Sequence, residues 1–103
     1  MSDLLKMLGC RYPIIQGPIG EMNSPKLVAA ICEAGAYGML ALGFSSPAVS
    51  RKLVDEVKAL TDKPFGANLM LMNQANGEIL DILAAAGVKT VTTSVGSPRE
   101  VYK

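Results

Sequence analysis

The chain has 103 residues, half of them apolar, and its ten basic and nine acidic side chains leave a net charge of +1. This length is enough for one domain with a hydrophobic core, and the apolar content argues against intrinsic disorder. The balanced charge gives no electrostatic reason to expect nucleic acid or an anionic membrane as a partner. Because the chain has no histidine, the usual hydrolase triads and most zinc sites are also excluded.

The N-terminal residues and the cysteines indicate where the protein resides. No long apolar segment follows Met1, and no apolar run reaches the roughly 20 residues that a membrane span requires. Cys10 and Cys32 form neither a CxxC pair nor a metal-ligand spacing. We therefore expect two reduced, partly buried thiols in a soluble cytoplasmic protein.

In chain order, a short helix at Asp3–Leu8 is expected first, closed by Gly9. Charge-free apolar runs then alternate with amphipathic, charged segments. Strands that alternate with helices in this way are typical of βαβ units on a parallel sheet, and strands without charge suit a sheet covered on both faces. The expected strands are Pro13–Ile15 with Gln16, Ala36–Leu42, Phe65–Leu71 and Thr90–Thr93.

Each strand after the short helix is followed by a signal for a helix start or by an amphipathic stripe. Ser24-Pro25, Ser46-Pro47 and Ser97-Pro98 combine a side chain that can cap the first N–H groups with a proline that fits the first helical turn. Gly35 and Gly87 stand where two of the helices should end.

Two of the helices carry a readable apolar face. For the helix that begins near Pro47, the residues expected to face the core are Val49, Leu53, Val54, Val57 and Leu60. For the helix Gly77–Ala86, they are Ile79, Ile82, Leu83 and Ala86.

The predicted fold class is therefore α/β, with parallel βα units. Four such units make residues 1–103 the N-terminal half of a (β/α)8 TIM barrel, an incomplete domain, since a whole barrel needs roughly 200 residues or more. A complete, doubly wound sheet of four strands is the rival architecture. Periodicity alone does not separate the two.

In parallel α/β folds, ligands bind at the carboxyl ends of the strands, and the loops that follow the predicted strands are almost uncharged. They offer glycines, amides and hydroxyls, which suit a neutral, planar ligand better than a metal. No phosphate-binding glycine motif is present. Asn68 is a polar residue among apolar neighbours and must find hydrogen-bond partners. Capping of a neighbouring loop and ligand binding both explain it.

Several sequence blocks together resemble one known family. These are Tyr12-Pro13-Ile14-Ile15-Gln16-Gly17-Pro18, the run from Leu60 through Thr61-Asp62-Lys63-Pro64-Phe65 to Met70, and the run from Val91 to Pro98. In their order and spacing they resemble the nitronate monooxygenase and enoyl-ACP reductase II family, and they cover nearly the whole chain. Ala36-Tyr37 departs from the Gly-Leu pair usual in that family, so altered packing is expected there.

The resemblance implies a flavin-binding TIM barrel with FMN at the carboxyl ends of its strands. In members of that family, the histidine acid/base and the phosphate-binding loops come after the region that this chain matches, so no catalytic residue is expected here. The implied positions are Gly17, Pro18, Ile19 and Asn68 for cofactor binding, and Ser94 and Gly96 on the substrate side.

The resulting hypothesis is a fragment of an FMN-dependent oxidoreductase. The intact parent would be an enzyme acting on a small molecule, either a nitronate or, with NADH or NADPH as electron donor, an enoyl thioester. The chain alone is expected to be inactive. One alternative is a non-catalytic half-barrel module that forms homo-oligomers through its exposed edges. Another is a small α/β domain of unrelated function.

Overall fold

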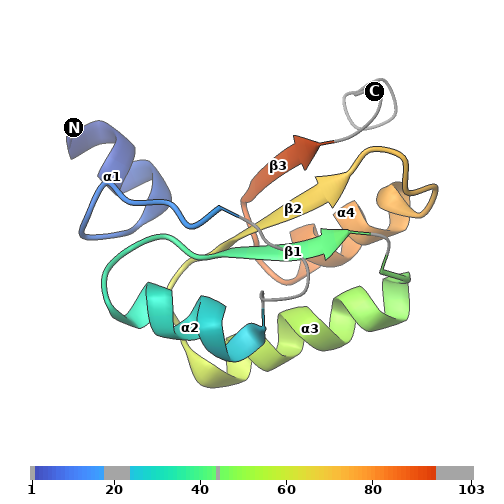
Figure 1. Ribbon diagram of the computed structural model, residues 1–103, viewed down its shortest axis with the longest axis horizontal. Coiled ribbons are helices and arrows are strands. Elements are labelled where there is room, and N and C mark those ends of the chain that lie inside the picture. Colours follow the sequence, from blue (N-terminus) through green and yellow to red (C-terminus); the bar gives the residue numbers. More distant parts are fainter. Residues whose placement is uncertain (1, 18–23, 44, 95–103) are drawn as a thin grey trace.

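The structure, a computed structural model that describes residues 2–17, 24–43 and 45–94, is a parallel sheet with helices packed along one face (Figure 1). Its parallel βα order agrees with the sequence prediction. The elements in chain order are α1 (Ser2–Leu8), α2 (Pro25–Glu33), β1 (Met39–Gly43), α3 (Pro47–Leu60), β2 (Gly66–Met70), α4 (Asn76–Ala85) and β3 (Thr90–Ser94).

The sheet has the order β1-β2-β3, and both pairs of strands are parallel. The first predicted strand forms only one parallel bridge, between Ile15 and Tyr37, so its prediction as a regular strand was wrong. Two hydrogen bonds hold it beside the chain that leads into β1: Tyr37 N–H donates to Ile14 O (2.8 Å), and Gln16 N–H donates to Tyr37 O (2.9 Å). Pro13 has no N–H to extend this ladder toward the N-terminus.

The predicted helix starts are confirmed at two of the three Ser-Pro pairs. The Ser24 hydroxyl accepts from Leu27 N–H (3.1 Å), and the Ser46 hydroxyl accepts from Val49 N–H (3.2 Å). Ser97-Pro98 lies outside the described residues. The glycine stops are also confirmed, since Gly35 and Gly87 have φ values of 100° and 81°, a left-handed conformation that glycine adopts without strain.

The buried face of α3 differs from the predicted one. Val54 and Val57 are buried as expected, but Val49 and Leu60 are 47% and 50% exposed, whereas Ser50 is fully buried. Positions 50, 54 and 57 share one helix face by their spacing, so the core-facing stripe is rotated slightly from the one that hydrophobicity favours. The apolar residues Val49 and Leu60 misled the prediction, because they lie outside the buried stripe.

The two faces of the sheet have different surroundings. The face toward α2, α3 and α4 carries the hydrophobic core, in which Leu40, Leu42 and Leu69 pack against residues such as Val54 and Ile79. The alternation of side chains along a strand places the opposite set on what we call the inner face. That set comprises Met39, Ala41, Gly43, Gly66, Asn68, Met70, Thr90, Thr92 and Ser94.

Tyr37 packs where the sequence suggested an altered contact. Its side chain is only 2% exposed, and a Cβ atom added to Gly66 would lie 3.0 Å from Tyr37 Cε2 and 2.6 Å from Met39 Sδ. The missing side chain of Gly66 therefore leaves the room that the large Tyr37 ring and the Met39 thioether occupy. Within the described ranges, no helix has the length and apolarity to cross a membrane.

Candidate functional site at the carboxyl edge of the sheet

A row of polar side chains crosses the inner face from β2 to β3. Asn68 pairs in register with Thr92, and Met70 pairs with Ser94. The Asn68 side chain is 9% exposed and lies between two hydroxyls. Thr92 Oγ1 donates to Asn68 Oδ1 (2.8 Å), and Asn68 Nδ2 donates to Ser94 Oγ (3.3 Å). The amide is thus held in one orientation by a neighbouring strand.

Asn68 does not cap a loop in the described residues, whereas Asn73 does. Asn73 Nδ2 donates to the carbonyl oxygens of Gly43 and Ser45, each at 3.1 Å, and Asn73 Oδ1 accepts from Ala75 N–H (3.0 Å). One side chain therefore joins the loop after β1 to the loop after β2. The sequence analysis missed this role, although an asparagine two residues after a predicted strand was the available signal.

A second asparagine stabilises the loop after β2. Asn76, in the first turn of α4, is 4% exposed, and its Nδ2 donates to Met70 O (3.0 Å). Met70 is the last residue of β2, so this bond fixes the turn between strand and helix. Together with Asn73, it gives the carboxyl edge of β2 a defined shape.

The residues singled out from the sequence are only partly brought together. Asn68 and Ser94 are in contact, as described above. Gly17 is exposed and lies two residues after Ile15, which bridges to the chain leading into β1. The segment of Gly17 is therefore separated from β2 by β1. Among the described residues, no atom lies within 4 Å of a Cβ built on Gly17, so these residues leave its backbone open to approach. Pro18, Ile19 and Gly96 lie outside the described residues.

The Asn68 row contains no ionisable group, and the perturbed side chains lie elsewhere. Burial raises the pKa of the Tyr37 hydroxyl, and a hydrogen bond with Thr90 opposes this shift only in part. Burial likewise raises the pKa of the Cys32 thiol, which donates to Pro64 O (3.4 Å). Both groups stay protonated at neutral pH. Cys10 and Cys32 are free thiols, as the sequence predicted, and the row itself can bind and orient a ligand through neutral donors and acceptors.

Comparison with known proteins decides the family, because a family model described as nitronate monooxygenase matches residues 1–100. The chain belongs to the nitronate monooxygenase family. Family members include a nitronate monooxygenase of Paraburkholderia phytofirmans, 41% identical over 75 residues, and one of Pseudomonas aeruginosa, 44% identical over 70 residues. These alignments cover 73% and 67% of this chain but only 20% of each relative.

Comparison with solved structures shows that this family member has the fold of part of a TIM barrel. FabK from Thermotoga maritima superposes with a TM-score of 0.88 and 30% identity, over 98% of this chain and 32% of that one. Nitroalkane oxidase from Streptomyces ansochromogenes superposes with a TM-score of 0.81 and 25% identity, over 95% and 38%. Both are TIM barrels, so the prediction of N-terminal barrel units is confirmed. The chain spans about a third of these structures.

Proposed function

We propose that this chain forms one wall of the cofactor site in an FMN-dependent oxidoreductase of the nitronate monooxygenase type. The match of the family model to residues 1–100 carries this proposal. The position of Asn68 supports it, because the resemblance assigns cofactor binding to this residue and its amide lies buried on the inner face of the sheet. The chain by itself is proposed to be inactive, since it holds no acid/base histidine.

The described residues fit the neutral ring of a flavin. Ala41 stands in register beside Asn68, so a small side chain borders the amide on one side. Hydroxyls border it on the other, and backbone and amide hydrogen bonds suit an uncharged planar ring. Gly17 would offer open backbone, Asn68 would hold the ring by its amide, and Ser94 would face the ring or the substrate. When bound, the flavin supplies the redox chemistry.

We propose a nitronate as the substrate class, because the relatives from Paraburkholderia and Pseudomonas carry the name nitronate monooxygenase. The second candidate is reduction of an enoyl thioester with NADH or NADPH as electron donor. The resemblance to the enoyl reductase branch over Gly66–Met70 favours it. Turnover of an alkyl nitronate without added nicotinamide, measured on a longer protein that includes this chain, separates the two.

Self-association and a cytoplasmic location remain proposals. Ile14 and Ile15 are 60% and 52% exposed, and they lie on the outer side of β1 at one end of the sheet. Apolar side chains at such an edge favour pairing with another chain. Sedimentation of the chain at increasing concentration tests this proposal: a species that stays monomeric would contradict it.

The first test of the cofactor proposal is a visible absorption spectrum of the chain after mixing with FMN and desalting. We expect little or no retained flavin, because no phosphate-binding motif is present. The sharper test is a hybrid in which this chain replaces the corresponding N-terminal part of the Pseudomonas aeruginosa nitronate monooxygenase. The folded hybrid should be yellow. Asn68→Ala should lower its FMN occupancy, and the exposed control Gln74→Ala should not. A folded hybrid that never holds flavin would refute the proposal.

A further inference from the structure

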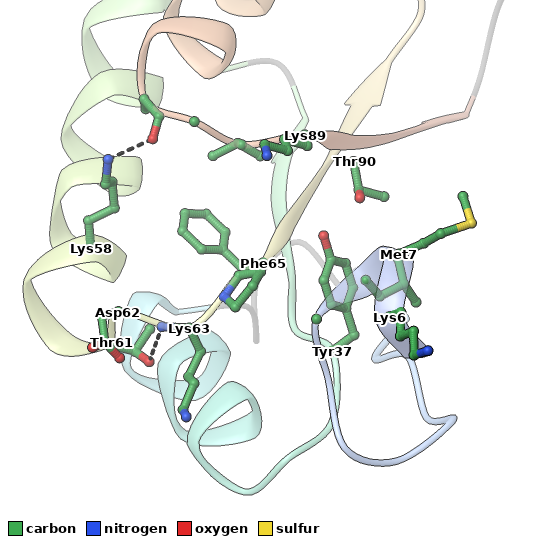
Figure 2. Close-up of a pocket in the computed structure, with 16 residues that line it drawn as sticks. Lys6, Met7, Tyr37, Lys58, Thr61, Asp62, Lys63, Phe65, Lys89 and Thr90 are labelled. Carbon is green, nitrogen blue, oxygen red and sulfur yellow. Dashed lines mark hydrogen bonds between the residues drawn. The ribbon is translucent and has the colours of Figure 1, made fainter. Parts of the chain in front are cut away.

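A cavity of about 560 Å³ lies at the opposite edge of the sheet from the Asn68 row (Figure 2). Its walls come from the end of α1, from the segment between α3 and β2, and from the segment between α4 and β3. Phe65 and Lys89, which directly precede β2 and β3, both line it. It therefore sits where the strands begin, and it shares no residue with the proposed flavin wall. Its volume is within the range of small-molecule sites.

The cavity has an apolar and aromatic floor. Phe65 and Tyr37 are 6% and 2% exposed, so both rings are fixed by packing. The Tyr37 hydroxyl is directed toward Thr90 in Figure 2, and the two are hydrogen-bonded. This floor suits a flat apolar group, which can lie on rigid rings without ordering them further.

The charge around the cavity is strongly one-sided. Ten basic and nine acidic residues are present in the whole chain, but the lining includes four lysines and one acid, Asp62. Lys58 is held in place, since its Nζ donates to Ala86 O at 2.6 Å (Figure 2). An ammonium has three donors, so two of them remain for other acceptors. Lys6 and Lys63 extend outward in Figure 2 and raise the potential around the rim.

An apolar floor below a positive rim selects one class of ligand. A flat ring or short chain buries its apolar surface against the apolar lining residues, while an anionic group placed toward Lys58 and Lys89 gains a charge-assisted hydrogen bond. A cation of the same shape would meet repulsion from the lysines, and a neutral analogue would gain only the apolar contact. The lining thus discriminates between ligands by the sign of their charge.

We propose that this cavity is a binding site for small organic anions of the aromatic carboxylate class, separate from the flavin site. The proposal does not depend on the flavin function, because the two sites occupy opposite edges of the sheet. Occupation would hold α1 against the starts of β2 and β3, since all three contribute to the lining.

The test uses the 103-residue chain and amide NMR spectra during titration with benzoate, benzyl alcohol and benzylamine. Benzoate should shift the amides of Lys89 and Thr90 and should bind several-fold more tightly than benzyl alcohol, with benzylamine weakest. Lys58→Gln and Lys89→Gln should each weaken benzoate binding about two- to fivefold, the range for one exposed charge pair. Neither should change binding of benzyl alcohol. The control Lys26→Gln removes an exposed lysine in the first turn of α2, away from the cavity, and should have no effect.

Several results would overturn the proposal. Equal affinity for benzoate and benzyl alcohol would show that the charge of the ligand plays no role. If Lys26→Gln weakened benzoate binding as much as the cavity variants do, the effect would come from the net charge of the chain and not from the cavity. Benzoate shifts confined to amides outside the cavity would locate binding elsewhere. Lys58→Gln also loses the bond to Ala86 O, and this loss can unfold the end of α4. In that case Lys89→Gln, an exposed substitution, decides.

Discussion

Replacing Asn73 tests whether one side chain holds together the two loops next to the candidate site. Asn73→Ala removes three hydrogen bonds, to Gly43 O, Ser45 O and Ala75 N–H. At about 0.5–1.5 kcal/mol each, their sum is about 1.5–4.5 kcal/mol. Asn73 is only half-buried, so water can reach some of the freed groups. We therefore expect a loss of about 1–3 kcal/mol in the free energy of unfolding.

A second substitution at the same position separates the three bonds. Asn73→Asp keeps the acceptor for Ala75 N–H but has no donor for the two carbonyls, and it places negative charge against them. If the link to the Gly43 and Ser45 carbonyls dominates, Asp should destabilise the fold about as much as Ala. Urea denaturation followed by circular dichroism gives the magnitude. Exchange of the Ser45 amide, which donates to Leu42 O, should become faster in both variants.

The exposed neighbour Gln74 supplies the control. Gln74→Ala should stay within about 0.5 kcal/mol of the parent chain, as surface substitutions usually do. An Asn73→Asp variant that matches the parent in stability, with unchanged exchange of the Ser45 amide, would refute the loop-joining role. The hydrogen bond from Ala75 N–H to Asn73 Oδ1 would then be the only contribution of Asn73.

Three further predictions concern Thr92, Tyr37 and Gly66. Thr92→Val should cost about 1–2 kcal/mol, because buried Asn68 Oδ1 loses its donor; Thr92→Ser, compared by urea denaturation, should restore most of it. Because the pKa of Tyr37 is raised in the folded state, the tyrosine of the unfolded chain ionises first as pH rises. The contribution of Tyr37 to stability is therefore complete below the ordinary pKa of 10.0 and is lost as pH rises through the pKa of the folded state. Tyr37→Phe should flatten the fall in stability from about pH 8 to about pH 11, and an identical pH profile would contradict this cause. Gly66→Ala should cost about 1–3 kcal/mol by overpacking against Met39 Sδ, and a cycle with Met39→Ala should be non-additive.

Local rules recovered most of the fold because the local signals agree with the tertiary structure. Ser24 and Ser46 cap their helices, and Gly87 closes α4, because each acts through its own backbone neighbours. The first strand failed as a prediction. Its apolar residues are typical of a strand, but whether a strand forms depends on a partner ladder, and only the Ile15 bridge is made.

The candidate site was less predictable than the fold. Asn68 could be recognised as a buried polar residue that needs partners, but the identity of those partners depends on the register between β2 and β3. The same holds for the fit of Tyr37 over Gly66, which joins residues distant in sequence. The cavity at the edge where the strands begin could not be predicted from the sequence, because its lysines come from separate segments that only the topology brings together.

The direction of the hydrogen bonds along the Asn68 row gives the edge of the sheet a polarity. Thr92 gives its hydroxyl hydrogen to Asn68, and Asn68 gives an amide hydrogen to Ser94. Because Ser94 Oγ accepts from Asn68, its own hydrogen is available to another acceptor. A molecule that meets Ser94 at this edge is therefore best matched by a lone pair, such as that of a carbonyl oxygen or an unprotonated ring nitrogen. An N–H group at the same place would instead have to share Ser94 Oγ with the Asn68 amide, by using the second lone pair of the hydroxyl.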